Sequence, residues 1–165
     1  MTHDSDSFPD YARSAGVGIV AGMRSQLPLA LLALESSRGR FDAGSQAPLR
    51  LLGEPVARRL LGLAAAGEFV GDKLPFTPSR LDPGPLGGRF LFGGLAGAAV
   101  AAESGRAPLL GVALGAAGAG IGAAAGYQAR SFLGSRTGVA DPVWGAVEDI
   151  AAIALGLAVL RASRR

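Results

Sequence analysis

The stretch GVALGAAGAGIGAAAG, Gly111 to Gly126, consists only of Gly, Ala, Val, Leu and Ile. Its glycines repeat at four-residue spacing, which in a helix lines them up along one groove. Such a groove lets a second backbone approach closely, which is how helices pack where lipid offers no hydrophobic driving force. The stretch therefore predicts a tightly packed transmembrane helix.

The same small-residue spacing recurs in other apolar runs. The pairs are Gly18 and Gly22, Gly67 and Gly71, and Gly93 and Gly97. The 165-residue chain is 49% apolar, yet it has 26 glycines and only seven Phe, two Tyr and one Trp, whereas soluble cores depend on larger side chains. We expect most of these grooves to serve packing within one chain. The alternative for the grooves is contact between copies in a homo-oligomer. The alternative to a membrane protein is a soluble helical bundle rich in Ala.

We predict an all-α, polytopic bundle of about five Gly/Ala-rich transmembrane helices. The predicted spans are residues 11–34, 56–74, 86–102, 107–130 and 142–160. Pro28 cannot donate to the carbonyl of Arg24, so the first helix should be kinked there. Pro75 ends the second span, and the proline-rich residues 75–85 should form a tight extended connector or a re-entrant cap. Asp141 is a suitable N-cap for the last span.

The spans belong to a single transmembrane helical domain, residues 11–160. A disordered acidic leader, residues 1–10, precedes it and a basic tail, residues 161–165, follows it. Polar loops are expected at residues 35–55 and 131–140. Counting Lys and Arg by loop gives nine on one side of the membrane and six on the other. Because cytoplasmic loops carry more Lys and Arg, this count favours an external amino terminus and a cytoplasmic carboxyl terminus. The protein is thus predicted to be multi-pass in the cell inner membrane.

Composition argues against several kinds of site. There is no cysteine, and the only histidine, His3, lies in the polar leader. This leaves no disulfide, thiolate, His-based metal site or Ser-His-Asp triad, and no cofactor is indicated. The arginines are spread between apolar runs without a dense basic block, so nucleic acid is not an expected partner, whereas the lipid bilayer is.

Ionisable residues inside the predicted spans are the main functional signal. Glu68 and Asp72 are four residues apart, so both project from one helix face, beside the Gly67 and Gly71 groove. Charges at bilayer depth are costly and mark functional sites by default. The predicted ligand-binding residues are Arg24, Glu68, Asp72, Lys73, Arg80, Arg89, Arg130, Glu148 and Asp149.

Three functions compete for these residues. The leading hypothesis is a transporter or channel-like conduit for a small charged solute or ion, with acidic groups binding cations or protons. The second is a non-transporting scaffold or accessory subunit, in which the charges form structural salt bridges. The third is an enzyme or flippase that grips a lipid phosphate through Arg80, Arg89 and Arg130. It ranks lowest because no nucleophile is paired with a base.

Several segments together carry a family resemblance. They are GMRSQLPLA, GEFVGDKLPFTPSR, GGRFLFGGLAGA, GAAGAGIGAAAGYQAR and PVWGAVEDIAA. In this order they resemble a family of small, uncharacterised bacterial integral membrane proteins, from about Gly16 to Leu160. Besides the nine residues above, the resemblance points to Pro75, Pro78, Ser79 and Tyr127. It implies no activity, and Gln26 departs from the small hydroxyl residue that the family pattern has.

Overall fold

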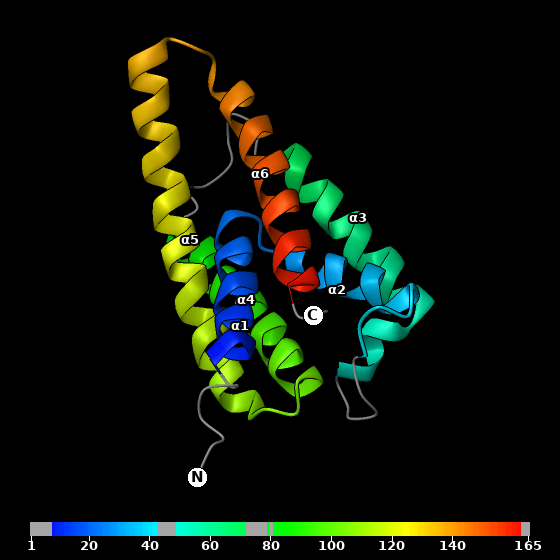
Figure 1. The fold of residues 1–165 in the computed structure, drawn as a ribbon. Helices are drawn as coiled ribbons and strands as arrows, with labels where there is room; N and C mark the ends of the chain where they lie inside the picture. The colour runs from blue at the N-terminus through cyan, green and yellow to red at the C-terminus, as the bar shows by residue number, and fades with distance from the viewer. Residues whose placement is uncertain (1–7, 43–48, 72–78, 80, 163–165) are drawn as a thin grey trace.

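The computed structural model describes residues 8–42, 49–71, 79 and 81–162, which form a helical bundle (Figure 1). Its elements are α1 (Phe8–Met23), α2 (Leu27–Ser37), the short 3-10 helix η1 (Leu49–Gly53), α3 (Pro55–Gly71), α4 (Pro83–Glu103), α5 (Pro108–Thr137) and α6 (Asp141–Arg161). The all-α prediction is confirmed, and the predicted first helix corresponds to α1 and α2 together.

Helices α1, α4 and α5 pack closely against one another (Figure 1). A Cβ added at Gly93 would lie 2.7 Å from the carbonyl oxygen of Gly115, and one at Gly111 would lie 2.5 Å from that of Gly97. Gly18 likewise faces the backbone of Gly115. Only glycine allows these backbones to approach so closely, so the predicted close packing at these positions is confirmed as packing within the chain.

Gly67 and Gly71 on α3 do not take part in this packing. A Cβ at either position would meet nothing within 4 Å. Helix α3 lies at the edge of the bundle beside α2, and Ala65 is its only fully buried residue. No helix among the described residues therefore packs into the groove formed by these two glycines, and contact of this groove with a second copy of the chain stays a prediction.

The predicted interruption of the first helix is confirmed. Helix α1 ends at Met23 and α2 begins at Leu27. Pro28 lies in the first turn of α2, where its missing N–H is not needed by the helix. After the break, α2 leaves the direction of α1 and packs against α3 (Figure 1).

Three helix boundaries differ from the predictions. Helix α4 begins at Pro83, inside the predicted connector, because prolines are tolerated in a first helical turn. Helix α5 continues through most of the predicted loop at 131–140 and stops at Gly138, whose φ of 65° ends the helix. Asp141 is the first residue of α6 rather than its cap, and its carboxylate pairs with Arg130 instead.

The first turns of α1 and the last turns of α6 lie at the same end of the bundle. Arg13 donates to the carbonyl of Val159 at 3.4 Å and to Glu103 at 3.1 Å. Helix α1 begins at Phe8, so the last part of the predicted leader is already helical. In this part, Asp10 pairs with Arg106 at 3.0 Å. The described ends of the chain thus lie at one end of the bundle, because α2 turns aside at the break, and the sides of the membrane on which they lie stay a prediction.

Helices α4, α5 and α6 are each long and apolar enough to cross a membrane. On their outer surfaces large apolar side chains are exposed, for example Leu109, Ile121 and Ile150. An exposed apolar surface of this extent is unfavourable in water but suits contact with lipid. These three helices indicate a membrane protein.

Candidate functional site

The break between α1 and α2 leaves backbone groups that a continuous helix would pair internally. The carbonyls at the end of α1 and the N–H groups at the start of α2 lose their partners four residues away. Within the break, Arg24 N still donates to Val20 O at 2.8 Å, and Leu27 N donates to Arg24 O at 3.2 Å. The remaining groups need side-chain partners, since unpaired backbone in an apolar environment is costly.

Glu68 on α3 supplies the acceptors for the start of α2. Its Oε1 accepts from Ser25 N at 2.7 Å and from the Ser25 hydroxyl at 2.9 Å, and its Oε2 accepts from Gln26 N at 2.9 Å. A carboxylate at this end also complements the positive end of the helix dipole. One side chain from another helix therefore caps α2 from outside.

Arg89 on α4 supplies a donor for the end of α1. This buried guanidinium donates from Nε to Gly22 O at 3.0 Å and from Nη1 to Pro85 O at 3.4 Å. Its Nη2 lies 3.8 Å from Oε1 of Glu68. A cation thus faces the negative end of α1 and an anion faces the positive end of α2, and the two also attract each other.

Arg24, in the break itself, connects it to α6. The side chain is fully buried, and its Nε donates to Oδ1 of Asp149 at 2.5 Å. Its Nη1 donates to Met23 O at 3.2 Å, and its Nη2 lies 3.9 Å from Oε2 of Glu148. The guanidinium also lies 5.9 Å from the centre of the Phe69 ring, within cation–π range. The predicted Glu148 and Asp149 pair therefore meets the break.

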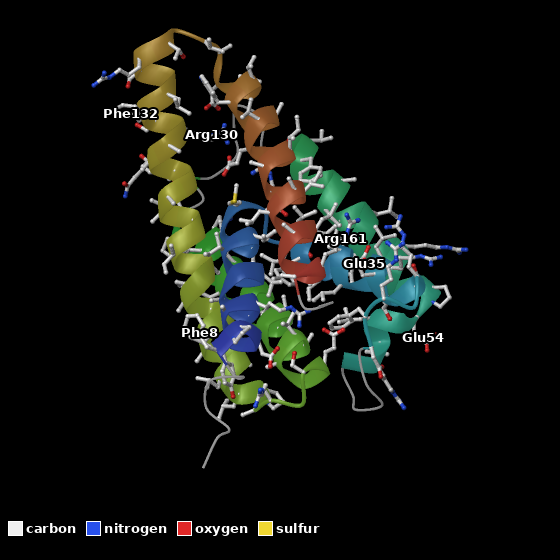
Figure 2. The ribbon with its side chains drawn as sticks, viewed as in Figure 1. Phe8, Glu35, Glu54, Arg130, Phe132 and Arg161 are labelled. Carbon is white, nitrogen blue, oxygen red and sulfur yellow. The ribbon has the colours of Figure 1, made fainter. Side chains whose placement is uncertain are left out.

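Arg130 on α5 extends the charges toward the surface. It lies between α5 and α6 (Figure 2) and pairs with Asp141 at the start of α6. Its Nη1 is 3.7 Å from Oε2 of Glu148. The exposed fraction of the side chains falls from 68% at Asp141 to 16% at Arg130, 7% at Glu148 and 0% at Arg24. Opposite charges thus alternate from the surface into the break.

Six of the nine predicted site residues meet in this arrangement. They are Arg24, Glu68, Arg89, Arg130, Glu148 and Asp149. The other three, Asp72, Lys73 and Arg80, lie outside the described residues. Helix α5 carries only Arg130 into the site, because its Gly/Ala-rich part packs against α1 and α4.

Sequence reasoning missed two features of the site. Ser25 contributes both its N–H and its hydroxyl to Glu68, and Phe69 places its ring beside Arg24. Ser25 adjoins the predicted kink and Phe69 adjoins Glu68, so proximity to a predicted site residue was the available signal. A second ionic cluster, in which Arg13 pairs with Glu103, holds the opposite end of α1 and was not predicted from the sequence.

Comparison with known proteins places the chain in one family. No curated protein and no solved structure matches it. A family profile matches residues 12–163, which include every described residue of the site. The predicted resemblance to an uncharacterised family is confirmed, and the chain belongs to the family defined by the domain of unknown function DUF4126.

Proposed function

We propose that this protein is a multi-pass inner-membrane transport protein, a transporter or channel-like conduit for a small cation or for protons. The interrupted helix is the proposed site. The observation that carries the proposal is that α1 breaks at the buried Arg24, where Glu68 from α3 and the buried Arg89 from α4 converge. In membranes, non-helical backbone is tolerated only where protein or water covers it, and broken helices form the ion and substrate sites of many transporters.

The charge balance of the site favours a cationic solute. Its carboxylates are Glu68, Asp141, Glu148 and Asp149, and its cations are Arg24, Arg89 and Arg130. Four negative charges face three positive charges, so one negative charge is in excess among the described residues. Arginine stays protonated at any physiological pH, which leaves the carboxylates as the groups that could exchange a proton or bind a metal cation.

Glu148 is the proposed relay between the surface and the break. Its Oε2 lies 3.7 Å from Arg130 and 3.9 Å from Arg24, distances of ionic attraction that exceed the usual hydrogen-bond range. This carboxylate therefore links the outer cation to the inner one. A proton or cation that enters beside Asp141 would reach Arg24 and Asp149 through this residue.

The test measures flux in liposomes that contain the purified protein. Internal pH is followed with an entrapped dye under an imposed potential, and Na⁺ and K⁺ uptake are measured in parallel. We expect the wild type to conduct one of these ions and Glu148→Gln to lose most of the flux. Glu103→Gln is the matched control, because this carboxylate pairs with Arg13 at the other end of α1. Absence of flux for all three ions, or normal flux in Glu148→Gln, contradicts the proposal.

A structural role is the second candidate, and the tight pairing of the site favours it. The 2.5 Å contact between Arg24 and Asp149 holds the break against α6, and the glycine packing holds α1, α4 and α5 together. The protein would then be an accessory subunit. Self-association would use Gly67 and Gly71 on α3, which no described residue covers. The flux test separates the two, since an accessory subunit conducts nothing by itself.

A further inference from the structure

Five arginines gather where the end of α2, η1 and the start of α3 pack against one another. We call this surface the basic corner; its members are Arg38, Arg40, Arg50, Arg58 and Arg59. Figure 2 shows nitrogen-tipped side chains pointing outward in the region of the labelled Glu35 and Glu54. The proposed transport site makes no use of these residues.

The backbone of the basic corner is held in place. Gly39, with a φ of 64°, ends α2, its N–H donates to Ser36 O at 3.0 Å, and Arg40 N donates to Glu35 O at 2.8 Å. This pair of bonds is a Schellman motif, which fixes the direction of the chain after a helix. Phe41 and Leu52 are buried in the core on either side of residues 43–48. The arginines therefore project from an anchored backbone.

Most of the positive charge in the corner has no internal counter-charge. Arg38 pairs with Glu35 at 3.2 Å, and Glu35 itself is buried. In contrast, Arg50, Arg58 and Arg59 make no ion pair with any residue that the structure describes.

The net charge of this segment is positive. Residues 35–59 contain five arginines and three carboxylates, which gives +2. Since Arg38 pairs with Glu35, the remaining balance is four arginines against Asp42 and Glu54. The surface thus presents excess positive charge to an external anion.

An exposed apolar stripe places the corner at the edge of the lipid. Val56, Leu60 and Leu63 are 64%, 62% and 71% exposed and recur at helical spacing on one face of α3. Arg59 lies three residues after Val56 and four before Leu63, so it belongs to the same face. In a membrane protein, such a stripe faces the acyl chains, and an arginine on that face near the start of the helix extends to the headgroup level.

We propose that the basic corner binds the phosphate headgroups of anionic phospholipids in the surrounding membrane. Guanidinium groups form bidentate, charge-assisted hydrogen bonds with phosphate oxygens. Clusters of basic residues beside membrane-embedded helices attract anionic lipids in this way. The bound lipids fix the level of α2 and α3 in the bilayer, which is a role separate from transport.

The test uses the full-length protein in mixed micelles and the fluorescence anisotropy of tail-labelled phospholipids. We expect phosphatidylglycerol to bind more tightly than phosphatidylcholine. Arg50→Gln/Arg59→Gln should weaken phosphatidylglycerol binding roughly tenfold to thirtyfold, given the typical contribution of one basic residue near an anionic surface. Arg50→Lys/Arg59→Lys keeps the charge and should retain most of the affinity. Arg136→Gln, an exposed arginine at the end of α5, should leave the affinity unchanged.

Three results would overturn the proposal. The first is equal binding of the two lipids by the wild type. The second is unchanged phosphatidylglycerol binding by Arg50→Gln/Arg59→Gln. The third is displacement of the lipid by millimolar inorganic phosphate, which would assign the corner to free phosphate. If the Gln variant fails to fold, the Lys variant decides, and loss of its preference for phosphatidylglycerol contradicts charge-based binding.

Discussion

Arg24 in the break after α1 and Asp149 on α6 are 125 residues apart in sequence, and the Nε of one donates to the Oδ1 of the other at 2.5 Å. The guanidinium is fully buried and the carboxylate is 13% exposed. This contact joins the interrupted helix to one of the three helices long enough to cross a membrane.

Removing one member of this pair should cost much more than replacing both. Arg24→Met removes the buried cation that faces both Asp149 and Glu148, which we expect to lower the free energy of unfolding by about 3–5 kcal/mol. Arg24→Met/Asp149→Leu should recover a large part of this loss, because an apolar pair of similar volume avoids the desolvation penalty. Thermal unfolding in detergent measures both. Equal losses in the single and double variants would contradict a coupled ion pair.

Glu68 should control the stability of the start of α2. Glu68→Ala removes the acceptor for the N–H groups of Ser25 and Gln26, at an expected cost of about 1–3 kcal/mol. Glu68→Gln keeps one oxygen acceptor and should cost less. Hydrogen exchange of these two amides should accelerate in Glu68→Ala. The exposed Glu54, changed to Ala, is the control and should leave this exchange at the wild-type rate.

Two glycines of the same spacing pattern should respond differently to alanine. At Gly111 the added Cβ would lie 2.5 Å from Gly97 O, so Gly111→Ala should destabilise the protein by about 1–3 kcal/mol through overpacking. At Gly67 nothing lies within 4 Å, and Gly67→Ala should be neutral or stabilise α3 by up to about 1 kcal/mol, because alanine favours helix. Thermal unfolding compares them. A lower unfolding temperature for Gly67→Ala would indicate that another chain packs against α3.

Substitution of Arg130 should reduce transport more than substitution of Arg136, which lies on the same helix. Arg130→Gln breaks the contacts with Asp141 and Glu148, so under the proposed function it should reduce ion flux in liposomes. Arg136 lies 4.8 Å from the centre of the Phe132 ring, near the end of α5, and Arg136→Gln should retain the flux. Equal flux in the two variants would remove Arg130 from the proposed path.

The sequence alone determined the class of structure and the place of the break. Small-residue spacing and long apolar runs predicted a membrane helix bundle, and Pro28 predicted the interruption, because both depend on local sterics and on composition. The same reasoning extended less well to helix ends. Pro83 and Gly138 shifted the boundaries of α4 and α5, since proline suits a first turn and a positive φ ends a helix.

Only the tertiary structure decided which charges meet. Glu68 was expected to line a helix-packing groove, but it accepts hydrogen bonds from Ser25 and Gln26 at the break. Asp141 was expected to cap α6, but it pairs with Arg130. Which charged side chains meet depends on how helices far apart in the chain are rotated and cross one another. The close contacts at glycine surfaces set this rotation and crossing. Spacing along one helix shows that two charges share a face and leaves open what that face meets.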